Sequence, residues 1–172
     1  MKKVFIVFLI HFFQFNFVTA DTTIAYLDMN KIISSSKSGL SINSQLKDIS
    51  SKNTKVFKED ARILKEQEIK LISQKNILSE SDFQLKIKEL KLAFNKYNKN
   101  RDKVNNDYNK LRVDSTNKLL KLINPILVSY SNDNNISLIL KKRDIVIGQT
   151  DLDITSEITQ IINKEIKQFK IQ

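Results

Sequence analysis

The sequence contains no Cys and no Trp, and it has one His, two Gly and one Pro among 172 residues. Without Cys the chain cannot form disulfides, thiolate nucleophiles or zinc–thiolate sites. Two Gly leave no room for a glycine-rich phosphate-binding loop, and the scarcity of Gly and Pro favours long uninterrupted helices. The net charge is +10, from 29 basic and 19 acidic residues. Taken alone, this charge indicates an anionic partner such as nucleic acid.

Residues 1–20 have the pattern of an export signal. Two Lys precede a mainly apolar run from Val4 to Phe17, and small residues precede Asp21. The run is short and interrupted by polar residues, although an uncleaved membrane anchor is the alternative. We therefore predict export of the protein and cleavage after Ala20. Since the only His lies in this segment, the mature chain lacks His and Cys, and we predict no enzyme activity, cofactor or metal.

The long stretch from Leu40 to Leu122 contains neither Gly nor Pro. A polar interruption at residues 79–82, with Ser79 three residues before Asp82, is typical of a capping box that opens a second helix. Two helices of about 40 residues, each about 60 Å long, explain this pattern better than one rod of about 120 Å. The sequence thus predicts a helical hairpin arm over residues 40–122 with its tip near 79–82.

A heptad seam runs along the second helix of this arm, at alternating steps of four and three, with two polar exceptions. It consists of Phe83, Ile87, Leu90, Phe94, Tyr97, Arg101, Val104, Tyr108, Leu111 and Ser115. The first helix has two registers: Ile42, Leu46, Ile49 and Val56, then Phe57, Ala61, Leu64, Leu71 and Leu78. We predict an antiparallel coiled coil with a register drift in the first helix, to which a partner chain could also contribute.

The two ends of the mature chain predict a small body. Residues 24–29 are typical of a strand, and residues 30–36 of a short helix that ends near Gly39. Residues 136–140 and 145–148 are predicted to form a hairpin with Lys141–Arg143 at its tip. Pro125 is expected to kink or break the preceding helix, and Asp153 or Thr155 to cap a final one.

These elements predict an α+β, helix-dominated fold. Residues 21–39 and 123–172 form a β-sheet body with short helices, and residues 40–122 form the long antiparallel coiled-coil arm. A small sheet with a thin core and free edges is expected to be shared in an oligomer.

The order and spacing of these segments resemble the Skp, or OmpH-like, family of periplasmic chaperones over essentially the whole mature chain. The resemblance rests on Ile24–Ile33, on Leu78–Glu80 followed by Lys88–Leu90, on Asn135–Leu140, on Ile145–Ile147, and on Asp153–Thr155. It implies a homotrimer with three helical arms around a cavity. It also implies ATP-independent holding of unfolded outer-membrane β-barrel proteins, which prevents their aggregation and aids their delivery to the outer membrane. Pro125 matches no motif of the family.

The excess charge lies in the second half of the arm. Residues 83–122 carry eleven basic and four acidic side chains, whereas residues 40–82 carry eight and seven. Five lysines fall away from the heptad seam: Lys88, Lys96, Lys99, Lys103 and Lys110. They form either an ordinary solvated face or a basic stripe that attracts acidic client chains, anionic lipid or lipopolysaccharide.

Other candidate sites favour structural roles. Phe83, Phe94, Tyr97 and Tyr108 are spaced for seam packing rather than client contact. Asp144, Asp151 and Asp153 lack the spacing of a cation-binding loop and suit turns and caps.

Two further classes of function remain as alternatives. A structural or tethering coiled coil of the envelope would bind one folded partner. A basic nucleic-acid binder fits the charge, but the export signal argues against it, so no nucleic acid is expected.

Overall fold

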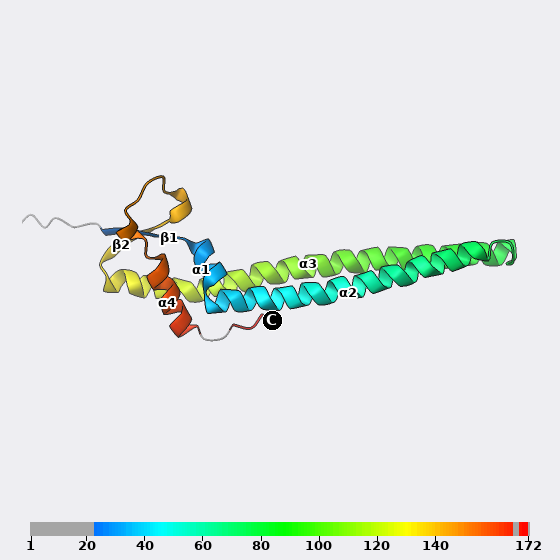
Figure 1. Cartoon of the computed structure of the whole chain (residues 1–172), viewed down its shortest axis with the longest axis horizontal. Coiled ribbons are helices and arrows are strands. Elements are labelled where there is room, and N and C mark those ends of the chain that lie inside the picture. Colours follow the sequence, from blue (N-terminus) through cyan, green and yellow to red (C-terminus); the bar gives the residue numbers. More distant parts are fainter. Residues whose placement is uncertain (1–22, 167–168, 172) are drawn as a thin grey trace, which may run out of the picture.

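The computed structural model describes residues 23–166 and 169–171, so the predicted export signal lies outside the described residues. A long helical hairpin projects from a small body that contains β1, and residues 169–171 lie at the base of this hairpin (Figure 1). The elements are β1 (Thr23–Leu27), α1 (Met29–Ser35), α2 (Lys37–Ser73), α3 (Glu80–Asp133), β2 (Ile136–Lys141), the 3₁₀ turns η1 (Lys142–Asp144) and η2 (Thr150–Leu152), and α4 (Thr155–Glu165). The predicted helix-dominated α+β fold is confirmed.

The sheet of the body consists of β1 and β2 in parallel, with Ala25 opposite Ile139 and Ile24 opposite Leu138. The whole arm is therefore the crossover between its two strands. Because side chains alternate between the faces of a strand, Ala25 and Ile139 point into the core. Ile24 and Leu138 lie on the other face and are exposed.

The predicted hairpin between residues 136–140 and 145–148 is wrong. After β2 the chain turns through η1, and residues 145–148 form no strand. Tyr26 provides the physical reason. Its backbone carbonyl accepts a hydrogen bond from Ile154 N at 3.0 Å, which draws residues 153–154 to the free edge of β1. The intervening segment is thereby looped out, and Val146 and Ile147 are 97% and 91% exposed.

The arm folds back at residues 74–79, slightly before the predicted position. The predicted cap is confirmed, since Ser79 Oγ accepts a hydrogen bond from Asp82 N at 3.2 Å at the start of α3. The Ser79 hydroxyl also donates to Asp82 Oδ2 at 2.6 Å. This cap satisfies one of the first backbone N–H groups of α3, which have no partner within the helix.

The predicted coiled-coil seam packs α3 against α2. Every seam residue of α3 is at least half-buried except Arg101, and Ser115 is buried. On α2 the change of register is also seen, because Phe57, Leu64 and Leu71 follow the seam while Val56 is exposed. Phe57 meets the Tyr97 ring edge-to-face at 6.2 Å between centroids. The aromatic side chains therefore pack in the seam, as their spacing predicts.

The start of α2 differs from the sequence prediction at Gly39. Instead of ending a helix, Gly39 lies in the first turn of α2, which Ser36 caps through its hydroxyl at 3.2 Å from Gly39 N. A Cβ at Gly39 would lie 1.6 Å from the carbonyl oxygen of Ile33. The missing side chain thus allows α1 and α2 to meet at a tight corner.

The core lies where the base of the arm meets the body. Leu119 and Ile123 of α3 and Ile158 and Ile162 of α4 are completely buried together with Ile32 of α1. Helix α3 continues through Pro125 to Asp133, so the predicted helix is confirmed and, of the two alternatives for Pro125, a break is excluded. The uninterrupted helix carries the arm directly into the core, which fixes the arm to the body.

Candidate functional site

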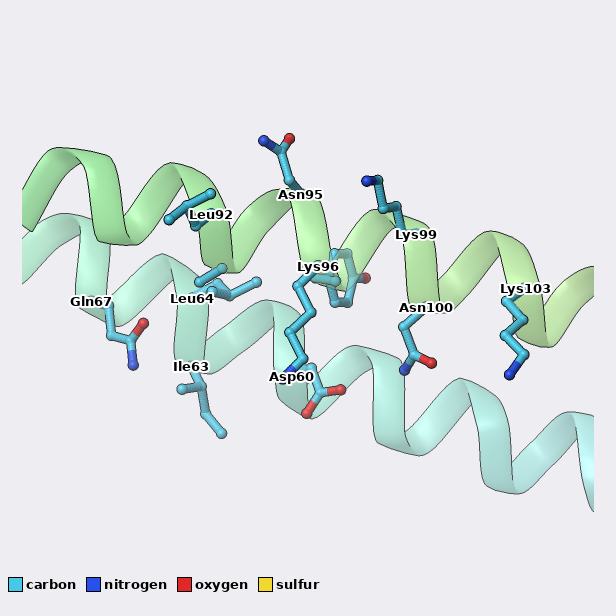
Figure 2. A pocket seen from close by; sticks show the side chains of 12 residues that line it. Asp60, Ile63, Leu64, Gln67, Leu92, Asn95, Lys96, Lys99, Asn100 and Lys103 are labelled. Carbon is cyan, nitrogen blue, oxygen red and sulfur yellow. The ribbon is translucent and has the colours of Figure 1, made fainter.

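The five lysines of the predicted basic stripe are all exposed on α3. Lys96, Lys99 and Lys103 line one open groove of about 780 Å³ along the hairpin. In Figure 2, Lys96 and Lys103 extend from α3 towards α2, whereas Lys99 points away from α2. Lys88 and Lys110 are not part of the groove lining. The structure therefore brings three of the five predicted residues together at one groove.

Apolar side chains accompany these lysines. Leu64 of α2 and Ala93 and Tyr97 of α3 are at least half-buried, and they give the groove an apolar floor. Ile63 of α2 and Leu92 of α3 are exposed at its sides (Figure 2). The groove thus offers hydrocarbon and ammonium groups side by side.

Ile63 and Leu92 were not identified as candidate site residues from the sequence. Both belong to pairs of exposed apolar residues spaced by seven, Val56 with Ile63 on α2 and Leu85 with Leu92 on α3. Heptad spacing keeps each pair on one side of its helix, outside the seam. A second apolar repeat beside the seam was the available signal.

The charges of the two arm helices are compensated differently. On α2, Arg62 pairs with Glu59 and Glu66 at 2.5 Å, and Lys65 pairs with Glu68 at 2.8 Å. Hydrogen bonding to Arg62 lowers the pKa of Glu59, and its two glutamate partners raise the pKa of Arg62. The described ion pairs include none of the five predicted lysines, although Asp60 also lines the groove. These five lysines of α3 thus have no ion-pair partner among the described residues and can attract an anion.

Helix α4 begins after Ile154, which provides no side-chain cap, so the predicted N-cap at Asp153 or Thr155 is wrong. Asp153 instead stabilises the turn that precedes the helix. Its Oδ1 accepts a hydrogen bond from Thr155 N at 3.1 Å where α4 begins, and its Oδ2 pairs with Lys142. In η1 the carboxylate Oδ1 of Asp144 lies 3.5 Å from Nε of Arg143. Within residues 23–166 and 169–171, no group of three His, Cys, Asp or Glu side chains is arranged to hold a metal ion.

A second exposed surface lies on the body. Ile24, Leu138 and Leu140 share the outer face of the sheet, next to the looped-out Val146 and Ile147. The fourth outward position, Tyr26, is buried instead, because Gly148 and Lys142 cover its ring and its hydroxyl donates to Gln149 O at 3.0 Å. The other three outward positions remain exposed and apolar, and we call this surface, with the looped-out Val146 and Ile147, the outer sheet face.

A protein-family model described as outer membrane protein (OmpH-like) matches residues 23–162, which include both strands and the entire arm. The chain belongs to the OmpH-like family. A crystal structure of an OmpH-like protein from Caulobacter crescentus, described as a candidate outer membrane chaperone, has the same fold with a TM-score of 0.81. The two chains are 13% identical, and the match covers 87% of this chain and 88% of the other.

Among curated proteins no match to this chain is found. In the described part of this OmpH-like chain, none of the helices has the length and apolar character needed to cross a membrane.

Proposed function

We propose that this protein is an ATP-independent holdase that binds unfolded outer-membrane β-barrel proteins between helical arms. The observation that carries the proposal is the amphipathic groove on the arm. It combines Lys96, Lys99 and Lys103 with the apolar Ile63 and Leu92. An unfolded chain presents apolar and charged groups in changing order, and a surface that offers both kinds of contact can hold many such sequences. The name and fold of its family support this function.

The proposed binding is the sum of many weak contacts rather than the filling of one specific pocket. The unpaired lysines of α3 attract acidic client segments at long range, and this attraction falls with a Debye length of about 8 Å at physiological salt. The apolar residues supply short-range burial, which salt does not screen. Such binding needs neither a nucleotide nor a reactive side chain, so we propose no enzymatic activity.

We also propose that three copies assemble through the outer sheet face. This face exposes five apolar side chains, those of Ile24, Leu138, Leu140, Val146 and Ile147. Apolar surface of this extent, next to the free edge of β2, favours association with another copy over exposure to water. A closed ring of three bodies would place three arms around one cavity, which is the arrangement that holding a client requires.

The proposed location is the periplasm. The segment 1–20 would direct export of the protein and would be removed by cleavage after Ala20. The residues that carry this proposal lie outside the described part of the chain. Export separates the protein from cytoplasmic nucleic acid, so the excess charge is directed instead at acidic clients or at anionic lipid and lipopolysaccharide.

The test is to dilute a denatured outer-membrane β-barrel protein into buffer with the purified chain and to follow aggregation by light scattering. Wild type is expected to suppress aggregation, and the triple change Lys96→Glu, Lys99→Glu and Lys103→Glu to weaken suppression. The matched control changes Lys52, Lys55 and Lys58 of α2 to Glu, since these exposed residues lie outside the groove lining. It alters the net charge equally and should retain activity.

Absence of suppression at excess wild-type protein would contradict the holdase function. Equal losses in both triple variants would contradict the role of the groove and leave net charge as the cause. Capture of a single folded envelope protein, without any suppression of aggregation, would instead favour the tethering function.

A further inference from the structure

The end of the chain is bound to the base of the arm. Residues 169–171 lie beside the first turns of α2 (Figure 1). Phe169 is 5% exposed and joins the core cluster that contains Ile42, Leu46 and Leu119. The family model ends at residue 162, so this tail lies beyond the matched part of the chain. The tail therefore occupies a site for which the family match provides no explanation.

The backbone of the tail is held by two polar side chains of α2. Gln45 Nε2 donates to Phe169 O at 2.8 Å, and Ile171 N donates to Gln45 Oε1 at 3.3 Å. Ser41 Oγ donates to the same Phe169 carbonyl at 3.0 Å. The Gln45 amide thus bonds the carbonyl of one residue and the N–H two residues later. One residue of a neighbouring parallel strand bonds its partner strand in the same way.

The side chains of the tail alternate in burial. Phe169 is buried, Lys170 is exposed and Ile171 is half-buried. The ammonium of Lys118 lies 5.8 Å from the centroid of the Phe169 ring, which adds a cation–π contact at the rim. The site therefore accepts an aromatic residue followed by a polar one and then an aliphatic one. Its backbone hydrogen bonds do not depend on the identity of any side chain.

We propose that Ser41, Gln45 and the apolar pocket that holds Phe169 form a binding site for an alternating strand segment of an unfolded β-barrel protein. Ile42, Leu46 and Leu119 belong to the core cluster at this pocket, and Lys118 lies at its rim. The protein's own tail occupies this site and competes with the client. The client class rests on the proposed holdase function. The strands of outer-membrane barrels alternate apolar and polar residues and carry aromatic residues at both membrane interfaces. Main-chain hydrogen bonds with pockets for alternate side chains are a general way to recognise such segments.

Competition in cis sets a threshold for client binding. A tethered tail has an effective concentration in the millimolar range, so a short segment in trans displaces it poorly. A long client that also binds the arm groove is itself tethered near the site, so its effective concentration there rises in the same way as that of the tail. The tail would thus favour long unfolded chains over short peptides.

The test uses a fluorescent peptide with the sequence of residues 166–172 and the full exported chain. Phe169→Ala in the protein is expected to release the tail, so that the peptide binds this variant at least about ten-fold more tightly than wild type. The double variant Phe169→Ala with Gln45→Met should bind the peptide about ten-fold more weakly than Phe169→Ala alone, because the two hydrogen bonds from the Gln45 amide to the peptide backbone are lost. The control is Gln84→Met, the same change at an exposed residue near the arm tip. A peptide in which Ala replaces its Phe should not bind.

Equal peptide binding by wild type and Phe169→Ala, or no effect of Gln45→Met, overturns the proposed site. If Phe169→Ala is unfolded by circular dichroism, the same comparison is made with Lys118→Ala, which loosens only the rim. In that case unchanged peptide binding overturns the proposal. Finally, a denatured β-barrel protein should displace the bound peptide. Failure of displacement while aggregation is still suppressed overturns the client assignment and leaves the holdase function standing.

Discussion

Lys142 Nζ lies 2.5 Å from Asp153 Oδ2, and this ion pair closes the loop between β2 and α4. Lys142 follows β2, whereas Asp153 bridges to Tyr26 on the far edge of β1. The pair therefore ties the two edges of the sheet together and holds the intervening Val146 and Ile147 outward. The geometry of this loop therefore determines which apolar side chains the body exposes beside the sheet.

The ion pair predicts a pH-dependent contribution to stability. Burial raises the pKa of Asp153, but hydrogen bonds from Lys142 and Thr155 outweigh it, so this pKa lies below its ordinary value. A carboxyl with a depressed folded-state pKa stabilises the fold above the unfolded pKa of about 4, and the contribution is lost as the pH falls through the folded pKa. Asp153→Asn should lower the free energy of unfolding by about 1 kcal/mol at pH 7.

Urea denaturation at pH 7 and at pH 3 measures this effect. The difference between wild type and Asp153→Asn should shrink at pH 3, because at that pH the unfolded wild-type chain binds a proton at this carboxyl, which favours unfolding. Asp151→Asn is the control, because the exposed Asp151 belongs to none of the described ion pairs. A constant difference at both pH values would show that the charge of Asp153 is irrelevant.

Gly39→Ala should strongly destabilise the protein. The new Cβ would fall 1.6 Å from the Ile33 carbonyl oxygen, and only movement of the α1–α2 backbone can relieve this overlap. We expect a loss of about 3 kcal/mol or more, at the upper end of the range for overpacking. Gly148→Ala is the control, since its Cβ would lie 2.8 Å from a ring atom of Tyr26, a side chain that can shift. Thermal unfolding that ranks Gly148→Ala as the more damaging change would refute this explanation.

Leu92→Ser should weaken client holding without affecting the fold. Leu92 is 60% exposed at the side of the groove, so its replacement removes apolar contact area for a client but little from the core. Val113→Ser provides the control, because Val113 is 52% exposed on the same helix and outside the groove lining. The aggregation assay should require more of the Leu92 variant for equal suppression, and both variants should keep the wild-type melting temperature. Equal activity of the two variants would argue against the groove.

Leu138→Asp should dissociate the proposed trimer. A carboxylate on the outer sheet face would be buried between copies without a partner, and the desolvation cost opposes association. Val128→Asp introduces the same charge at a residue of α3 that is also exposed but lies outside this face. Light scattering with size-exclusion chromatography should give a smaller mass for Leu138→Asp alone. A trimeric Leu138→Asp variant would exclude this face as the interface.

The arm could be predicted because its determinants are local. Ser79 and Asp82 are three residues apart, and the seam repeats every seven residues, so both patterns lie within a few turns of one helix. Chain length without Gly or Pro then sets the length of the arm. The register change before Phe57 could also be predicted, because the spacing of the apolar residues in the first helix shifts at that point.

The sheet was only partly predictable. The apolar run of Ile136–Leu140 correctly indicated a strand, which the structure extends to Lys141, but periodicity does not say which strand will pair with it. The nearest candidate in sequence was residues 145–148, whereas the true partner is β1, on the other side of the whole arm. A pattern of neighbouring residues carries no information about contacts between segments far apart in the sequence, and for this reason the hairpin prediction was wrong.

Composition and spacing therefore account for a basic, helix-dominated chain with a coiled-coil arm, because helix formation and seam packing follow from residues close in sequence. Tertiary structure decided the parallel pairing of β1 and β2 and the docking of Phe169 against α2. It also decided the placement of Ile63 and Leu92 along one groove with the lysines. Each joins segments far apart along the chain. Their contact depends on how buried surfaces of the complete fold fit together.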